Sequence, residues 1–134
     1  MAKKKKPKTI EQLVMPKLRE VSRWWHAKKA ARDLAKVQVE DGTFKNGNTK
    51  YKTMYQCASC KHAFERQDTH MDHREPVVDI ETGFVDWNTY IARLFVEVDG
   101  YQCLCKGCHD MKTLIENEVR KEYRKKKVDK PEKD

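Results

Sequence analysis

Apolar residues recur at helical spacing through the first part of the chain and predict two helices there. The positions that share this spacing are Ile10, Leu13, Val14, Leu18, Val21 and Trp25. Thr9 and Gln12 have the spacing of a capping box, so we expect the first helix to begin after Thr9. Because proline disrupts a helix interior, Pro16 predicts a short first helix and then a longer one that ends near Val37.

Two glycine-containing pairs, Asp41-Gly42 and Gly47-Asn48, are turn signals that close this helical region. From Tyr51 the pattern changes to short, strand-like pieces around two cysteine pairs. We therefore expect a disordered basic tail, a basic helical leader, a compact domain and a polar tail. These segments span residues 1–8, 9–50, 51–126 and 127–134. The pattern as a whole predicts a small α+β fold.

The compact domain is expected to contain a short helix, a strand and a long final helix. Asp86 can cap a helix over residues 87–95, and the Asp99-Gly100 turn precedes a strand over residues 101–104. The final helix should run from about Lys106 to Lys126. Its apolar positions at helical spacing are Met111, Leu114, Ile115 and Val119.

Composition indicates a thin hydrophobic core. The chain has 134 residues, of which 38% are hydrophobic and 37% are charged. A small domain with so few apolar residues usually needs disulfides or a bound metal to be stable. The five cysteines are therefore the first residues whose role has to be explained.

The formal net charge of +8 is unevenly distributed and suits a polyanionic partner. Residues 1–40 contain 12 Lys/Arg against 4 Asp/Glu, whereas residues 41–105 contain 7 against 10. The predicted second helix places four basic residues around Trp24 and Trp25. These candidate DNA-binding residues are Arg23, Lys28, Lys29 and Arg32.

Neither a signal peptide nor a membrane span is expected. The lysine run at residues 3–6 is not followed by an apolar segment, and nothing approaches the roughly 20 apolar residues that span a bilayer. We therefore expect a cytoplasmic protein with no membrane partner. In a reducing cytoplasm, cysteines bind metal more often than they form disulfides.

Two Cys-x2-Cys pairs predict a structural zinc site. Two residues between cysteines allow both thiolates of one turn to reach a single ion, and two such turns complete four ligands. The predicted ligands are Cys57, Cys60, Cys105 and Cys108. Two unrelated pairs or redox dithiols are the alternative. Cys103 shares a strand face with Cys105, and we expect it to be a small buried hydrophobe rather than a competing ligand.

The residues between and after these pairs resemble a nuclease motif. Asp72-His73-Arg74-Glu75-Pro76-Val77 lies in the insertion, and Leu104-Cys105-Lys106-Gly107-Cys108-His109-Asp110-Met111-Lys112-Thr113 closes it. "DHxxPV" followed by "LCxxCHxxKT" resembles the four-cysteine branch of the HNH (His-Me finger) endonucleases that are common in bacteriophages. The resemblance covers residues 51–113, about half of the chain, and implies a ββα-metal module. For a phage-encoded protein, it also implies the cytoplasm of the host cell.

The chemistry of phosphodiester hydrolysis matches these residue types. An imidazole titrates near neutral pH, so His73 can deprotonate a water molecule. Asp72 offers a carboxylate oxygen and His109 an imidazole nitrogen to a divalent cation, expected to be Mg²⁺ or Mn²⁺. The resemblance implies the same roles: His73 as general base, and Asp72 and His109 as ligands of a catalytic ion.

Several further residues could support this site. Lys112 lies one helical turn after His109 and could contact a phosphate of the DNA. His70 shares a strand face with Asp72 and is either an extra ligand, an orienting group or a surface residue. Because His109 follows Cys108 directly, the zinc site is expected to fix where its imidazole points.

The chain departs from the family pattern at Gly100. The HNH family carries an asparagine nine residues before its final histidine, which hydrogen-bonds across the loop that presents the base. Asn88 and Asp99 are the candidate substitutes. We expect a handicapped rather than an inactive enzyme, and we expect Gly100→Asn to raise the cleavage rate several-fold.

Three functions remain open at this point. The first is a metal-dependent endonuclease acting on double-stranded DNA, as a homing enzyme or in phage DNA processing. The second is a nucleic-acid-binding zinc module with weakened catalysis, which the Gly100 departure favours. The third is an RNA-directed partner, because a basic surface does not identify the sugar. Neither the recognition sequence nor the protein partners follow from the residues.

Overall fold

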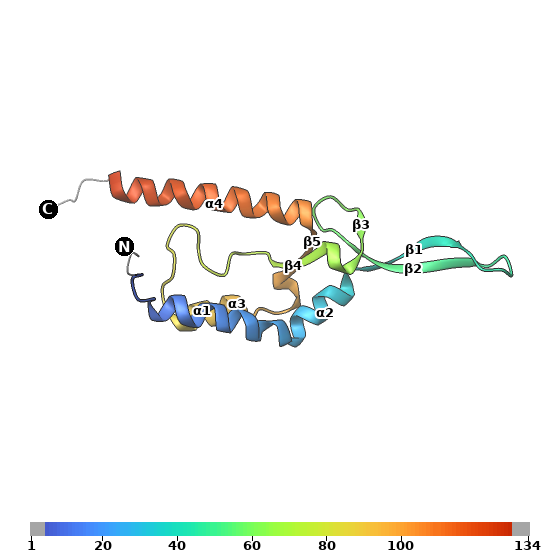
Figure 1. The fold of residues 1–134 in the computed structure, drawn as a ribbon, viewed down its shortest axis with the longest axis horizontal. Helices are drawn as coiled ribbons and strands as arrows, with labels where there is room; N and C mark the ends of the chain where they lie inside the picture. The colour runs from blue at the N-terminus through green and yellow to red at the C-terminus, as the bar shows by residue number, and fades with distance from the viewer. Residues whose placement is uncertain (1–4, 130–134) are drawn as a thin grey trace.

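In the computed structural model, which describes residues 5–129, the chain forms a small α+β fold (Figure 1). The α-helices of this part are α1 (Ile10–Val21), α2 (His26–Leu34), α3 (Trp87–Leu94) and α4 (Lys106–Asp129). The strands are β1 (Lys36–Thr43), β2 (Thr49–Gln56), β3 (Ala63–Phe64), β4 (Thr69–His73) and β5 (Tyr101–Cys105). They form two antiparallel sheets, one of order β1-β2-β3 and one made of β4 and β5.

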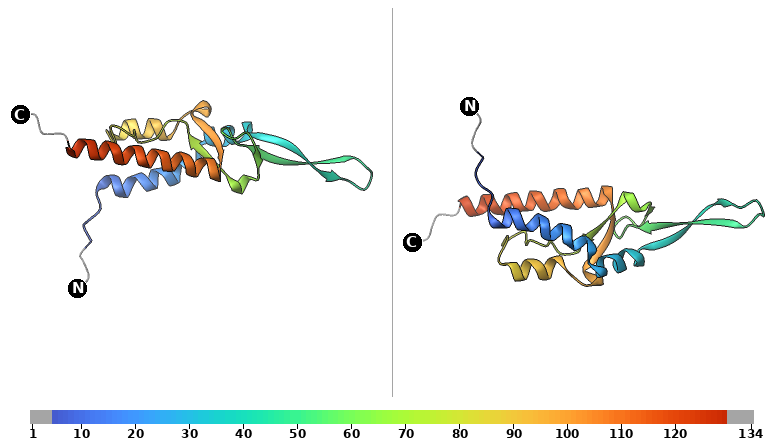
Figure 2. Two further views of the ribbon diagram at one scale, coloured as in Figure 1. Left: turned by 90° about the horizontal axis from the view of Figure 1, so that it is seen from above. Right: turned by 60° about the horizontal axis from the view of Figure 1, so that its bottom comes forward.

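The β4–β5 pair lies between two helices (Figures 1 and 2). Its register pairs Thr69 with Cys105 and His73 with Tyr101. Both strands contact α2 and α4, and α4 follows β5 without an intervening loop. Since side chains alternate across a strand, neighbouring residues of β4 enter two different environments. Met71 and Tyr101, for example, pack with the alanines of α2.

The first helix begins as predicted but passes through Pro16. Thr9 and Gln12 form the expected capping box, in which each side chain accepts a backbone N–H of the other residue. The predicted break at Pro16 is wrong, because α1 runs unbroken from Ile10 to Val21. Met15 and Leu18, on either side of the proline, pack against the α3 core cluster. This packing holds the helix despite the missing N–H of the proline.

The helical region instead breaks at the tryptophan pair. A 3-10 turn spans Ser22–Trp24, and Trp25 adopts an extended backbone with φ of −68° and ψ of 122°. Trp25 Nε1 donates a hydrogen bond of 2.7 Å to the carbonyl oxygen of Val96. Its ring packs edge-on against Phe95 at a centroid distance of 5.7 Å. Trp24 points away from the protein, with 84% of its surface exposed.

The prediction of helix up to Val37, and of a helical leader to residue 50, is also wrong. Helix α2 ends at Leu34, and residues 36–56 form a long β1–β2 hairpin. Val37 and Val39 are half-buried between exposed neighbours, so β1 has the two-residue period of a strand. Gly47 takes a φ of 87° at the hairpin tip, a conformation that glycine adopts at no steric cost. These turn glycines and the alternating valines are the sequence signals for the hairpin.

The later elements agree with the prediction. Asp86 caps α3 by accepting the backbone N–H of Thr89, and β5 and α4 occupy the expected positions. Residues 127–129 of the predicted polar tail continue α4, whereas residues 130–134 lie outside the described residues. Residues 5–8 of the predicted disordered tail have no regular structure, and residues 1–4 likewise lie outside the described residues.

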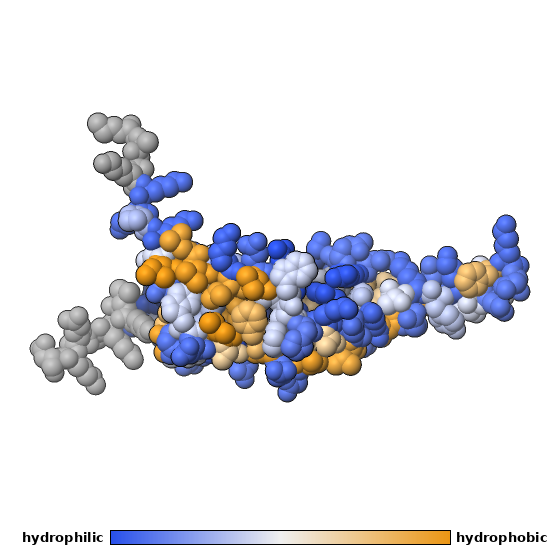
Figure 3. Space-filling view, turned by 90° about the horizontal axis from the view of Figure 1, so that it is seen from below, coloured by the Kyte–Doolittle hydropathy of each residue, from blue (hydrophilic) through white to orange (hydrophobic). Residues whose placement is uncertain are grey.

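The core is thin, as the composition predicts. Within residues 5–129, most of the buried residues form three small clusters, centred on Tyr101, on Cys57 with Leu104, and on Tyr90 with Leu94. Many apolar side chains are left exposed, and Figure 3 shows hydrophobic residues gathered on one end of the molecule. The exposed apolar side chains include three of the positions predicted for the final helix: Met111, Leu114 and Ile115. Within residues 5–129, no helix is long and apolar enough to cross a membrane.

Candidate metal centre and candidate active site

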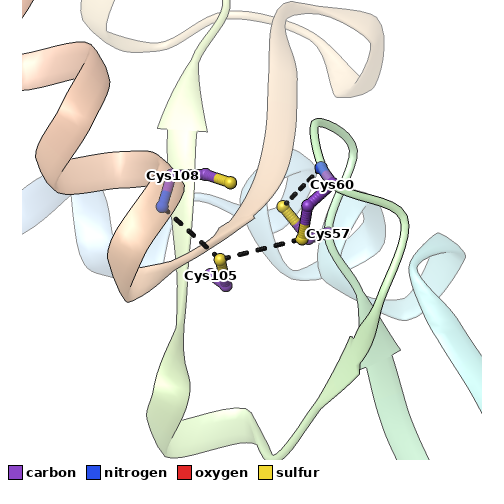
Figure 4. A group of neighbouring side chains, drawn as sticks. All are labelled: Cys57, Cys60, Cys105 and Cys108. Carbon is purple, nitrogen blue, oxygen red and sulfur yellow. Dashed lines mark hydrogen bonds between the residues drawn. The ribbon is translucent and has the colours of Figure 1, made fainter.

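Four cysteines converge where the β5–α4 junction meets the loop after β2 (Figure 4). Their Sγ atoms all lie within 4.8 Å of one another, and those of Cys60 and Cys105 are 4.0 Å apart. In a tetrahedral zinc site with Zn–S bonds of about 2.3 Å, the sulfur atoms are roughly 3.8 Å apart. The cluster therefore fits one zinc ion. All five cysteines are free of disulfide bonds.

The two cysteine turns share one backbone geometry. The N–H of Cys60 donates to Cys57 Sγ, and the N–H of Cys108 donates to Cys105 Sγ, each at 3.5 Å. Burial disfavours the Cys57 thiolate, but donation by three backbone N–H groups outweighs it and lowers the pKa of this thiol to about 6. Such N–H groups stabilise the thiolate form, which is the form that binds zinc.

Lys61, directly after the first cysteine pair, has a φ of 67° and so occupies the left-handed region. This conformation turns the chain back, so that the N–H of Cys57 bonds the carbonyl of His62 at 2.9 Å. Cys103, by contrast, is buried outside the four-cysteine group. Burial raises the pKa of the Cys103 thiol, consistent with its predicted role as a small hydrophobe.

His109 lies next to the cysteine cluster. Cys105 ends β5, Cys108 lies in the first turn of α4, and His109 follows it. From this position the His109 ring stacks on that of His70 in β4, with centroids 4.7 Å apart. His109 Nε2 lies 3.9 Å from Asp72 Oδ1. The predicted residues Asp72, His70 and His109 therefore meet between β4 and α4.

The two oxygens of Asp72 have different partners. Oδ2 accepts hydrogen bonds from Gln102 Nε2, at 3.1 Å, and from the ammonium of Lys112. Oδ1 instead faces His109. Two ligands bound about 2.1 Å from one ion in an octahedron lie roughly 3.0 Å apart when adjacent and 4.2 Å apart when opposite. The separation of 3.9 Å matches neither value, so Asp72 and His109 would have to move about 0.9 Å closer to bind one octahedral ion as adjacent ligands.

His73 makes contacts that differ from those of Asp72. Its Nε2 atom lies 2.8 Å from the carbonyl oxygen of Leu94, and its ring packs on Tyr101. Because a carbonyl only accepts, Nε2 carries the proton, and the lone pair of the neutral ring is on Nδ1. Burial, together with the charges of Lys28 and Arg19, holds the pKa of His73 below its ordinary value.

The loop after His73 is held mainly by backbone groups. The N–H of Arg74 bonds the Gly100 carbonyl, and Arg74 Nε bonds the Asp99 carbonyl, both at 2.9 Å. Lys112 Nζ also donates to the His73 carbonyl at 2.8 Å. Asp99 thus takes part through its backbone. Asn88 is exposed in the first turn of α3, whereas His73 bonds the last turn.

Gly100 leaves no room for the family asparagine. A Cβ added to it would lie 2.6 Å from both Cβ and Cγ2 of Val96, closer than such atoms approach in proteins. The expectation that Gly100→Asn improves the protein is therefore wrong on steric grounds. The loop is held instead by the three hydrogen bonds of Arg74 and Lys112.

The predicted basic residues are spread over the α1–α2 region. Lys28 is half-buried near His73, and burial together with the charges of Arg32 and Arg23 lowers its pKa. Lys29 is exposed. Arg23 Nη2 lies 3.9 Å from Glu20 Oε1. A cation that is partly desolvated among other cations favours the binding of an anion.

Sequence reasoning missed three residues at this site: Arg19, Arg74 and Gln102. Gln102 faces Asp72 because the two are register partners in β4 and β5. A correct prediction of the β4–β5 register would therefore have identified Gln102 as a partner of Asp72. The roles of Arg19 and Arg74 depend on chain segments far apart in the sequence and leave no local signal. No family model, curated protein or solved structure matches the chain.

Proposed function

We propose that the protein is a metal-dependent DNA endonuclease of the HNH type, which hydrolyses phosphodiester bonds. The approach of Asp72 Oδ1 to His109 Nε2, at 3.9 Å between β4 and α4, carries this proposal. Two antiparallel strands followed by a helix are the arrangement expected of a ββα-metal module, and here they hold the residues of the DHxxPV and CHxxKT motifs.

His73 is the general base in this proposal. Its proton on Nε2 is committed to the Leu94 carbonyl, which orients the ring and leaves Nδ1 to accept a proton from water. Burial and the neighbouring cations favour the neutral imidazole, the form that can accept this proton. The Leu94 carbonyl therefore acts as an orienting group for His73.

Asp72 and His109 would hold the catalytic ion, Mg²⁺ or Mn²⁺. When bound, such an ion supplies positive charge that stabilises the phosphate and the leaving oxygen in the transition state. Gln102 orients the Asp72 carboxylate by bonding Oδ2, so that Oδ1 stays turned toward His109. The structural zinc would hold α4, and hence His109, in place.

Asp72 lies on the side of β4 that faces α4. Basic residues on the opposite side, near His73, would bind the DNA backbone. Lys28 and Arg19 both act electrostatically on His73, so a phosphate bound by them would lie near the base. Arg23, Lys29 and Arg32 extend this positive surface along the Ser22–Trp24 turn and α2. Their contacts are sequence-independent and predict binding that weakens steeply with salt.

Cleavage of supercoiled plasmid DNA, with and without Mg²⁺ or Mn²⁺, tests this function. The proposal expects relaxed or linear product only when the divalent ion is present. Asp72→Ala and His109→Ala should both weaken the response to added metal and slow the cleavage. His62→Ala is a matched control, because this histidine is exposed. Folded, zinc-loaded protein that leaves plasmid and linear duplex intact at all metal concentrations would exclude a DNA endonuclease.

A DNA-binding zinc module without strong catalysis is the second candidate. The ammonium of Lys112 lies against Asp72 Oδ2, so this carboxylate already has a positively charged partner within the chain. A binding module of this kind would bind duplex DNA with a steep salt dependence and leave it uncut. The plasmid assay together with a binding titration separates the two candidates.

A further inference from the structure

The β1–β2 hairpin is an arm that projects from the rest of the protein (Figures 1 and 2). It is held at its base, where β2 pairs with β3 and contacts β5. Residues 40–51, which form the outer part of the arm, are all exposed. A two-stranded ribbon without a covering layer is only marginally stable in water. The fold therefore gives this segment no packing role that would account for its length.

The tip of the arm carries positive charge, whereas two acidic residues, Glu40 and Asp41, lie just before it on β1. From Gly42 to Phe64 the chain contains four lysines and no aspartate or glutamate. Lys52 pairs with Glu65 near the base of the arm. Lys45 and Lys50 flank the tip, and Figure 3 shows the arm as mostly hydrophilic. This charge complements a polyanion.

The tip also presents groups that can bond nucleic-acid bases. Asn46, Asn48 and Thr49 offer amide and hydroxyl groups at the turn, where Gly47 allows the chain to reverse. Phe44 beside them is 53% exposed, although an isolated apolar side chain gains nothing from contact with water. Amides bond adenine edges, and apolar side chains contact the thymine methyl group in the major groove of DNA.

The shape of the arm fits the same groove. The register of β1 and β2 shifts between Glu40 and Thr43, and Gly42 has a φ of 84° there. A bulge of this kind increases the right-handed twist of a ribbon. The major groove is about 12 Å wide and admits a two-stranded β-ribbon. Strands of eight residues extend about 26 Å, which corresponds to roughly 7–8 base pairs.

We propose that the β1–β2 arm enters the major groove of duplex DNA and contacts bases several base pairs from the cleavage site. This inference rests on the proposed function, since it takes DNA as the partner. A second copy of the chain is the competing occupant, because β1 is an edge strand that another strand could extend. The bulge at Gly42 interrupts the edge where such pairing would run, and the lysines of the tip would repel those of a second copy.

The test compares two doubly substituted proteins of equal charge. Lys45→Gln/Lys50→Gln neutralises the tip of the arm, and Lys125→Gln/Lys126→Gln removes the same charge from exposed positions near the far end of α4. Each phosphate contact contributes about 0.9 to the slope of log K against log salt. The tip variant should therefore have a slope about 1.8 shallower than the wild type, while the α4 variant keeps the wild-type slope.

Footprinting and methylation interference locate the arm on DNA. The wild-type footprint should extend roughly 7–8 base pairs beyond that of the tip variant, on one side of the site. Methylation of guanine N7, which lies in the major groove, should weaken wild-type binding within that extra segment and leave the tip variant unaffected. Zinc content and melting temperature should be the same in all three proteins.

The outcomes distinguish this inference from the function on which it rests. If the wild type neither binds nor cuts DNA, the proposed function fails. If it cuts DNA but the tip variant keeps the wild-type slope and footprint, the arm does not touch DNA and only the inference fails. A wild-type protein that sediments as a dimer, and a tip variant that does not, would identify a second copy as the occupant and overturn the inference.

Discussion

Two neighbouring residues of β4, Asp72 and His73, have contacts on opposite sides of the strand pair. Asp72 faces His109 on α4, whereas His73 bonds the last turn of α3 at Leu94. If these residues act together on one phosphodiester, the scissile phosphate has to lie across the end of β4. In that position it meets the base from one side and the ion from the other.

Replacing His73 with alanine tests its role as base. Loss of a general base typically costs about 10²–10⁴ in rate, so His73→Ala should lower the single-turnover cleavage rate by that factor. The affinity for DNA and the zinc content should stay close to those of the wild type. His62→Ala, which removes an exposed imidazole, should cut at the wild-type rate. A His73→Ala protein with unchanged cleavage would exclude His73 as the base.

The close packing of Val96 against Gly100 predicts that a side chain at position 100 destabilises the protein. A side chain here collides with Val96, and overpacking of this kind typically costs about 1–3 kcal/mol. Gly100→Asn should therefore lower the free energy of unfolding by about this amount, and the cleavage rate should fall with it. Gly107→Asn is the matched control, because a Cβ at Gly107 meets nothing within 4 Å. Chemical denaturation measures both, and equal stability of the two variants would contradict the clash.

At the scale of elements, the break between α1 and α2 depends on Trp25. Its indole N–H bonds the Val96 carbonyl and so ties the helical leader to the segment that precedes β5. A single hydrogen bond is worth roughly 0.5–1.5 kcal/mol net. Trp25→Phe, which keeps a ring but loses the donor, should lower the free energy of unfolding by at least this amount. Trp24→Phe should change it little, because Trp24 is exposed. Equal losses in the two variants would show that the bond is not stabilising.

The elements that the sequence predicts correctly are those with local signals. Asp86 caps α3, and the cysteine spacing identifies the metal site, because each pattern is completed within a few residues. Pro16 misled the prediction because packing by Met15 and Leu18 outweighs its local effect. The β1–β2 hairpin was missed because Val37 also fits a helical period, although its alternation with Val39 is that of a strand.

Some residues of the candidate active site could likewise be predicted from the sequence, whereas several of its contacts could not. Motif residues such as Asp72 and His109 could be named from their residue types and from the resemblance to the HNH motif, and the structure brings them together. The bond from His73 to the Leu94 carbonyl could not be foreseen, since a backbone carbonyl has no sequence signature. The sequence alone shows only that Gly100 replaces the asparagine of the HNH motif that the chain resembles. The hydrogen bonds of Arg74 that hold the same loop become visible only in three dimensions.

At the scale of the whole molecule, the core within residues 5–129 consists mainly of three small clusters, so we expect folding to depend on a metal ion at the four cysteines. Structural zinc contributes an apparent binding free energy of roughly 10–16 kcal/mol in small zinc modules. We expect one zinc ion per chain by elemental analysis, and a chelator should unfold residues 51–113. Cys57→Ala should lose the ion, whereas Cys103→Ala should keep it, because Cys103 lies outside the cluster. Folded protein that contains no zinc would contradict the site.

Cys108, a candidate zinc ligand, and His109, a candidate ligand of the catalytic ion, are consecutive residues in the first turn of α4. If the four cysteines hold zinc, loss of the ion should also disturb the alignment of His109 with Asp72. Oxidants that attack the thiolates, or scarcity of zinc, would then inactivate the proposed nuclease. In a nuclease that depended on both sites, damage to the cysteines would therefore end cleavage rather than leave it uncontrolled.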